Sequence, residues 1–196
     1  LGGVIRERFH HLAEGCLAPT RDVCHRSCFF KLPMQLPSGQ RSVTLEELWR
    51  RHWAAQYTEK ASERDASSCC QGIADNMRQE YLEKEPACMI LALDRLGPDN
   101  TKRLTAVDFP EYIDFMESGQ YECVGALLHH GQRLTTGHFI SVFKISWHGE
   151  RRFASCNDEK STLVPWSFLE ASLRREEVYV LLYIRVDVRE PTMSGD

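Results

Sequence analysis

The sequence lacks a long apolar run and a surplus of basic residues, and both absences narrow its function. No stretch of its 196 residues approaches the roughly 20 consecutive apolar positions of a membrane-spanning helix. The first residues, LGGVIRERFHH, place charges where a signal peptide needs its apolar segment. A formal net charge of -4 argues against the sustained basic surface that nucleic acids and anionic membranes require. We therefore expect an intracellular protein, cytoplasmic or nuclear, with no nucleic-acid partner and no membrane partner.

Internal repeats are also absent, and low complexity is confined to the short tail EPTMSGD. With 42% hydrophobic and 27% charged residues, the composition is that of a globular protein with one domain, or one domain plus a subdomain. Because the sequence begins with Leu1, we expect a processed product or a piece of a longer chain.

Strand patterns dominate the second half of the sequence. The runs there are separated by short glycine-containing turns such as WHGE, which favour antiparallel pairing. The expected strands lie in residues 29–39, 87–96, 102–115, 121–131, 138–147, 151–157 and 178–186. The residues before position 29 are expected to form cysteine-containing loops, and residues 59–68 an exposed polar loop. The predicted class is α+β, with a mainly antiparallel sheet in the second half.

One helix is predicted in the first half, over SVTLEELWRRHWAAQY. Thr44 and Glu47 have the spacing of a capping box, and apolar residues follow at helical spacing. A second helical pattern covers VPWSFLEASLRREE, between the last two strands.

A histidine opens the strand GHFISVFKISW, and its position suggests chemistry. If residues 138–147 and 151–157 form a hairpin, their far ends meet, and His138 lies beside Asn157 and Asp158. An imidazole that acts as a general base needs a partner on its other ring nitrogen. Asparagine can fill that role without adding charge, which suits cysteine chemistry, where thiolate and imidazolium already form an ion pair. A structural histidine at a strand end is the alternative, and the remaining histidines, His129 and His130 among them, are expected to be solvated.

Eight cysteines raise the question of metal binding. Three of them lie in apolar runs and are expected in the core: Cys88, Cys123 and Cys156. Cys24 and Cys28 form a C-x3-C pair, and Cys69 and Cys70 follow about forty residues later. Adjacent cysteines converge poorly on a tetrahedral ion, so at most one of Cys69 and Cys70 is expected to bind it. The spacing fits a zinc site in which His25 or Cys16 supplies the missing ligand. It also fits a reduced, metal-free cluster.

Several motifs together resemble the ubiquitin-specific protease family. The strongest stretch is YECVGALLHHGQRLTTGHFISVFKISWHGERRFASCND, which is similar to the family's histidine box: His130-Gly131, Gly137-His138-Phe139 and Asn157-Asp158. The stretches LALDRLGPDNTKRLTAVDFP and VYVLLYIR are similar to the family's later strands, and DVCHRSC and SSCCQG to its two zinc knuckles. The resemblance covers roughly residues 14–186, and its motifs occur in the family's order.

The resemblance implies a papain-like cysteine protease fold. Residues 1–82 would form a fingers-like subdomain with degenerate zinc knuckles, residues 83–188 a palm-like subdomain, and residues 189–196 a tail. His138 would be the general base, Asn157 its orienting partner and Asp158 a polar auxiliary. Gly137 and Phe139 would line the channel for the C-terminus of ubiquitin or a ubiquitin-like modifier, and zinc would be held by Cys24, Cys28, Cys69 and Cys70.

One family motif has no match in the sequence. The family's nucleophilic cysteine lies in an N-terminal thumb, and Cys16 in AEGCLAPT lacks the context of that box. Whether the chain is an enzyme is thus open. It is expected to be the ubiquitin-binding part of a deubiquitinating thiol protease that joins a thumb from elsewhere in the precursor. The alternative is a catalytically inactive scaffold of the same fold that binds ubiquitin or a ubiquitin-like modifier.

Overall fold

The fold is rich in β-strands. A computed structural model describes residues 2–11, 19–27, 29–59, 76–97, 101–115, 119–133 and 136–186, and this described part contains fourteen strands and three helices. The chain divides into two compact units, one formed by residues 1–28 and 50–86 and the other by residues 29–49 and 87–196. No helix in the described part is long and apolar enough to cross a membrane.

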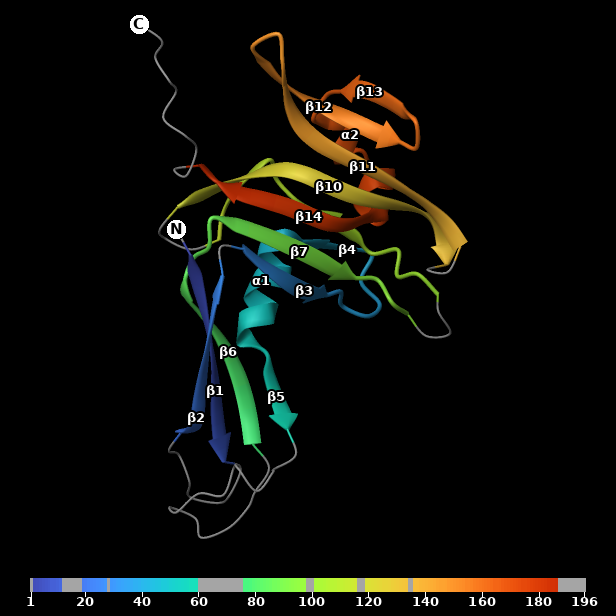
Figure 1. Cartoon of the computed structure of the whole chain (residues 1–196). Helices are drawn as coiled ribbons and strands as arrows, with labels where there is room; N and C mark the ends of the chain where they lie inside the picture. The colour runs from blue at the N-terminus through green and yellow to red at the C-terminus, as the bar shows by residue number, and fades with distance from the viewer. Residues whose placement is uncertain are drawn as a thin grey trace, which may run out of the picture. The chain divides into compact units, whose positions relative to one another are not determined.

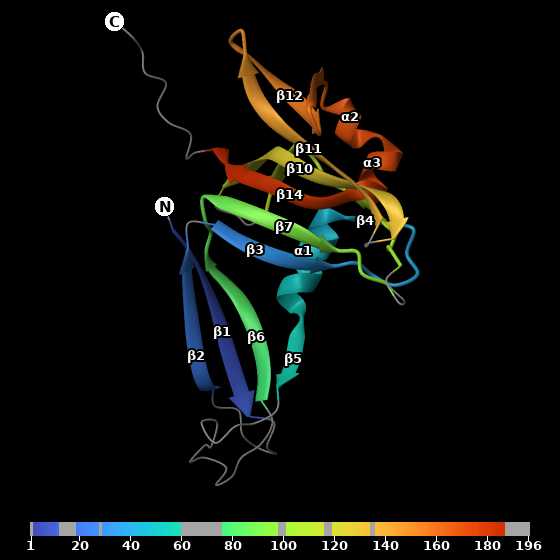
Figure 2. The ribbon, with the colours of Figure 1, turned by 45° about the vertical axis from the view of Figure 1, so that its right-hand side comes forward.

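The first unit contains a four-stranded antiparallel sheet (Figures 1 and 2). In spatial order its strands are β2 (Pro19–Ser27), β1 (Gly3–His11), β6 (Asn76–Lys84) and β5 (Gln56–Glu59). Ile5 and Phe9 are buried on one face. The Arg6 guanidinium bonds Asp22 at 3.0 Å and Glu83 at 2.9 Å, on the two neighbouring strands. The expectation of loops was therefore wrong for residues 3–11 and 19–27, because cross-strand ion pairs stabilise strands that carry few apolar residues.

The second unit is organised around an eight-stranded sheet, parts of which are labelled in Figure 1. Its strands, in spatial order, are β13 (Lys160–Val164), β12 (Glu150–Asn157), β11 (Thr136–Trp147), β10 (Gln120–Arg133), β14 (Val178–Arg185), β7 (Cys88–Asp94) and β3 (Phe29–Gln35), with β9 (Tyr112–Asp114) paired to β10. All neighbouring pairs are antiparallel except β3 with β7. The expected antiparallel sheet in the second half is present.

Residues 29–49 belong to the second unit, although they precede the boundary expected at residue 82. The reason is the parallel pairing of β3 with β7, which runs from Phe29 opposite Cys88 to Gln35 opposite Asp94. The compact units therefore differ from the two continuous ranges 1–82 and 83–188.

Helix α1 (Leu45–Ala54) begins where the sequence predicted. The Glu47 backbone N–H donates to the Thr44 hydroxyl at 3.1 Å, which caps the first turn. Leu45 and Leu48 are buried, and the Trp49 ring packs against Phe115 with centroids 4.3 Å apart. Thr44 ends the short strand β4 (Ser42–Thr44), which pairs in parallel with β8 (Ala106–Asp108). The second predicted helix is split into α2 (Ser167–Glu170) and α3 (Ser172–Glu177).

Arg95, directly after β7, is fully buried and connects three segments of the second unit. Its Nε donates to the Val178 carbonyl at 2.6 Å, and its Nη1 donates to the carbonyls of Arg103 and Thr105 at 2.9 and 2.8 Å. Its Nη2 donates to the Arg175 carbonyl at 2.9 Å. Burial lowers the pKa of Arg95 to about 10, so the group stays charged at neutral pH and holds the segment after β7 against the junction of α3 and β14.

Candidate active site

The hairpin of β11 and β12 positions the candidate site, and it is the hairpin that the sequence predicted. The two strands pair from Trp147 opposite Glu150 to Ser141 opposite Cys156. Both turn residues have positive φ, 50° at His148 and 77° at Gly149, which is typical of a type I′ turn. Because the turn lies at one end of the hairpin, the first residues of β11 and the last residues of β12 meet at the other end.

His138 and Asn157 lie together at that far end. Side chains alternate along a strand, so His138 continues the row of the buried Ile140 and Val142. Asn157 ends the corresponding row of β12. The His138 Nε2 atom lies 2.5 Å from the Asn157 Oδ1 atom, a short hydrogen bond. The structure thus confirms the expected proximity of the two residues, while their chemical role stays a prediction.

The partner of Nε2 determines the state of the His138 ring. An amide oxygen can only accept, so Nε2 carries the proton of this hydrogen bond. In the neutral ring the other nitrogen, Nδ1, then holds a lone pair. Among the described residues, Asn157 and Asp158 are the two partners of the His138 side chain. The arrangement leaves Nδ1 able to accept a proton, as a general base must.

Asp158 contributes less than Asn157. Its carboxylate Oδ2 lies 3.7 Å from His138 Nε2, and its side chain is 76% exposed. A charge this exposed is screened by water, so its influence on the imidazole is small. Asp158 adopts a positive φ of 52° in the two-residue turn between Asn157 and Lys160, which aspartate tolerates better than most residues.

Gly137 is held so close to its neighbours that no side chain fits. A Cβ atom there would lie 2.2 Å from the His130 carbonyl oxygen and 2.5 Å from His129 Nε2. Contacts shorter than 3.0 Å essentially never occur for real Cβ atoms. His138 pairs with His130 in the β10–β11 ladder, so the backbone just before His138 is fixed against the end of β10.

Phe139 lies on the opposite face of β11 from His138 and is half exposed. Its ring packs against His129, with centroids 4.6 Å apart, and against Tyr179, at 6.2 Å. A half-exposed aromatic ring with a fixed orientation can contact a ligand at low entropic cost. Its assignment to substrate binding, like that of Gly137, stays a prediction.

Two histidines of β10 were expected to be solvated, and this was wrong for His129. His129 is only 2% exposed, and burial, with a smaller effect from the Lys102 ammonium, lowers its pKa. The Nδ1 atom of His130 lies 2.6 Å from the Glu177 carboxylate. These contacts could not be predicted from the sequence, because Lys102 and Glu177 lie far from β10 along the chain.

The predicted zinc ligands lie mostly outside the described residues. This applies to Cys28, Cys69 and Cys70, whereas Cys24 is an exposed free thiol on β2. Within the described ranges, no three His, Cys, Asp or Glu side chains converge as a metal site would require. His25, a candidate additional ligand, lies with its Nε2 atom 3.1 Å from the Glu7 carboxylate. Zinc therefore stays a prediction.

The remaining described cysteines are not arranged as nucleophiles. Cys123 is buried as expected, and burial raises the pKa of its thiol to about 12. Cys156 lies partly buried beside Asn157, with its Sγ 3.1 Å from the Ser161 hydroxyl. A catalytic thiol needs a lowered pKa or an adjacent base, and Cys123 has the opposite environment.

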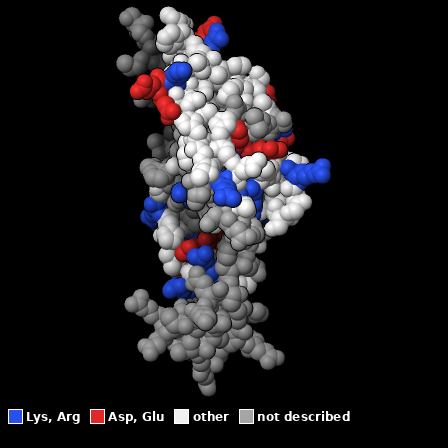
Figure 3. Space-filling model, turned by 90° about the vertical axis from the view of Figure 1, so that its right-hand side faces the viewer, with Lys and Arg blue, Asp and Glu red and all other residues white. Residues whose placement is uncertain are grey.

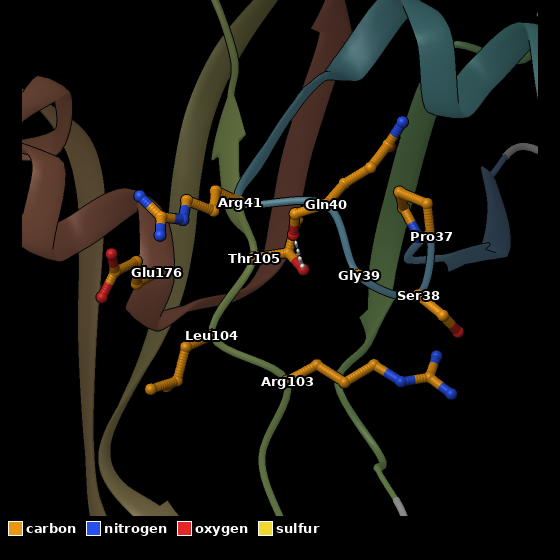
Figure 4. A pocket seen from close by; sticks show the side chains of 9 residues that line it. All are labelled: Pro37, Ser38, Gly39, Gln40, Arg41, Arg103, Leu104, Thr105 and Glu176. Atoms are coloured by element: carbon orange, nitrogen blue, oxygen red, sulfur yellow. Dashed lines mark hydrogen bonds between the residues drawn. The ribbon is translucent and has the colours of Figure 1, made fainter.

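A pocket of about 660 Å³ lies apart from the histidine, between the turn after β3 and the segment before β8 (Figure 4). Thr105 Oγ1 donates to the Gln40 carbonyl at 3.0 Å across it. The Arg41 and Glu176 side chains point to one side of the pocket, and Arg103 points toward Ser38. None of the residues predicted from the sequence lines this pocket.

Charges of both signs are interspersed on the face shown in Figure 3. The described part of that face has no continuous basic patch, which agrees with the slightly acidic composition.

Comparison with known proteins identifies the fold. No protein-family model and no curated protein matches the chain. Among solved structures, the SAGA DUB module Ubp8/Sgf11/Sus1/Sgf73 bound to monoubiquitin has a chain that is 19% identical, with a TM-score of 0.67 over 96% of this chain. A SAGA DUB module with a Ubp8 variant and a truncated Sgf11, and a yeast SAGA DUB module with an Sgf73 mutant, each match at 20% identity and a TM-score of 0.69.

The fold is like that of a ubiquitin-specific protease, as the sequence resemblance implied at this level. The chain spans about two fifths of the matched chains, 41% of their length. Sequence identity this low supports the fold and leaves activity, substrate and partners to be inferred from the site.

Proposed function

We propose that the chain is the ubiquitin-binding part of a deubiquitinating thiol protease, which hydrolyses isopeptide or peptide bonds at the ubiquitin C-terminus. The observation that carries this proposal is the His138–Asn157 pair, with a 2.5 Å hydrogen bond on Nε2 and Nδ1 left as a base. The similarity to a fold that has been solved with monoubiquitin supports the choice of substrate.

In this mechanism His138 Nδ1 takes the proton of a cysteine thiol, and the resulting ion pair is thiolate and imidazolium. The thiolate attacks the carbonyl carbon of the ubiquitin C-terminal residue. As the tetrahedral intermediate collapses, His138 returns its proton to the leaving amine. A water molecule, deprotonated by the same imidazole, then hydrolyses the thioester and releases the thiol. Asn157 keeps the ring in the Nε2–H tautomer and in one orientation throughout.

We assign the thiol to a thumb segment elsewhere in the precursor. Among the described residues, the polar partners of His138 are Asn157 and Asp158 and not a cysteine, and Cys156 bonds Ser161. The second unit would then be palm-like and the first unit fingers-like.

Gly137 and Phe139 would form one wall of the channel for the ubiquitin tail. The Gly137 backbone is in direct contact with β10, and Phe139 offers a half-exposed ring that packs on His129. Such a narrow channel suits a tail that ends in glycines, because larger side chains would collide with its walls.

Zinc, if bound by Cys24, Cys28, Cys69 and Cys70, would stabilise the first unit rather than take part in the reaction. Metal content by atomic emission, and the loss of cooperative unfolding on chelation, test this assignment. A metal-free chain that unfolds identically with and without chelator rules it out.

The test is hydrolysis of a fluorogenic ubiquitin C-terminal amide by the longest natural form of the protein, beside ubiquitin binding by this chain. We expect His138→Asn to abolish hydrolysis and to preserve ubiquitin binding. The matched control is His148→Asn in the exposed turn of the same hairpin, which should hydrolyse like the wild type. Binding without hydrolysis in the longest form would support the inactive scaffold instead, and absence of ubiquitin binding would refute both.

A further inference from the structure

A buried lysine lies beneath the strand end that carries Gly137 and His138. Lys102 is only 7% exposed, although lysine is almost never buried without a partner. Burial, followed by repulsion from Arg95, lowers the pKa of its ammonium, while Glu177 and Glu176 act in the opposite direction. Keeping an amine in this environment costs free energy, so its contacts need an explanation.

The contacts of Lys102 converge on the end of β10. Its Nζ donates a short hydrogen bond to the carbonyl of His129, and its backbone N–H donates to the Gln132 carbonyl at 3.1 Å. An isolated bridge joins the preceding residue, Thr101, to Arg133. The side chain and the backbone of this segment therefore hold the same short stretch of β10, residues 129–133.

That stretch of β10 is the surface on which the active-site backbone rests. The His129 ring and the His130 carbonyl oxygen are the atoms that leave no room for a Cβ on Gly137. His130 is also the register partner of His138. A shift of the His129 carbonyl would thus be transmitted directly to Gly137 and His138, because close packing leaves no slack between them.

We propose that Lys102 is a positioning residue for the candidate base. Through its hydrogen bond to the His129 carbonyl, the Lys102 ammonium fixes the position of the end of β10. This position keeps His138 Nε2 within hydrogen-bonding distance of Asn157 Oδ1. The structural part of this inference stands on the contacts alone, and its catalytic consequence rests on the proposed function.

The structural part is tested on this chain by solution NMR. In the wild type we expect a nuclear Overhauser contact between the His138 ring proton Hε1 and the Asn157 side-chain amide. Lys102→Met removes the donor and keeps a chain of similar length, so the contact should be lost. Lys102→Arg keeps a donor and should restore it. Lys31→Met, at an exposed lysine of β3 in the same sheet, is the matched control and should leave the contact unchanged.

If Lys102→Met does not fold, the same contact is measured in Lys102→Gln. The shorter glutamine side chain cannot reach the His129 carbonyl without movement of the strand, so the contact should again be lost. A folded Met or Gln variant with the wild-type contact between His138 and Asn157 would overturn the proposal. This outcome requires no enzyme activity, so it is distinguishable from failure of the proposed function.

The catalytic part is tested on the longest natural form with the ubiquitin amide. A misplaced base lowers the rate of the chemical step, by about 10- to 100-fold for a displacement near 1 Å. We expect such a fall in kcat for Lys102→Met, an unchanged KM, and partial recovery in Lys102→Arg. An equal fall for Lys31→Met, or a change in KM alone, would argue that Lys102 has only a general stabilising role.

Discussion

Replacing Gly137 with alanine is the sharpest perturbation of the site. The added methyl group would lie 2.2 Å from the His130 carbonyl oxygen, which is backbone and belongs to the β10–β11 ladder. Neither the added methyl carbon nor the His130 carbonyl oxygen can move without breaking the strand pairing next to His138. Overpacking a well-packed site typically costs about 1–3 kcal/mol, and a clash with backbone belongs at the upper end, so we expect Gly137→Ala to lose about 3 kcal/mol of unfolding free energy.

The assay is urea unfolding of this chain, followed by tryptophan fluorescence. Gly149→Ala is the control, because a Cβ at Gly149 meets nothing within 4 Å and only the positive φ of 77° opposes it. That left-handed conformation costs about 1–2 kcal/mol for a residue with a Cβ. If Gly137→Ala destabilises the chain no more than Gly149→Ala does, the close approach of Gly137 to His130 is wrong, and with it the account of how His138 is held.

Three further predictions concern Asn157, Arg95 and His129. Asn157→Ala, at an exposed position, should change the unfolding free energy by less than about 0.5 kcal/mol while kcat falls about 10- to 100-fold; an unchanged kcat would remove Asn157 from the mechanism. Arg95→Met should lose about 3 kcal/mol or more in urea unfolding, because it leaves four carbonyls without this donor and an unsatisfied buried acceptor costs about 1–3 kcal/mol. Arg95→Lys should not restore the loss, and full rescue by lysine would contradict this. Burial lowers the pKa of His129 from 6.5, so the unfolded chain binds more protons than the folded chain. This contribution to stability is complete above about pH 6.5 and is lost as the pH falls. His129→Gln should therefore lose less stability than the wild type between pH 7.5 and 5.5, and an equal loss would refute the lowered pKa of His129.

Much of the second unit could be predicted from the sequence, because its elements are local in origin. The alternation of residues 138–147 and 151–157 and the His-Gly turn fix a hairpin, and the hairpin alone brings His138 to Asn157. The helix start at Thr44 follows from a capping pattern within four residues. Such features depend on short-range geometry, which can be predicted from local residue patterns.

The parts that could not be predicted depend on pairing between distant segments. The sequence of β1 resembles a polar loop because Arg6, Glu7 and Arg8 follow one another, and the strand is stabilised by ion pairs to β2 and β6. The placement of residues 29–49 follows from the parallel pairing of β3 with β7. His129 is buried and its carbonyl accepts from Lys102 because β10 and the segment that contains Lys102 come together in the folded chain.

The measurement that tests the central claim most directly is reaction with a ubiquitin that carries a C-terminal electrophile, read by intact mass. It is made on the longest natural form, in the wild type and in His138→Asn. We predict covalent labelling of the wild type at a cysteine of the thumb segment, outside this chain, and strongly slowed labelling of the variant. Equal labelling of both forms, or no labelling of a wild type that binds ubiquitin, would contradict the assignment of His138 as the base of a thiol protease.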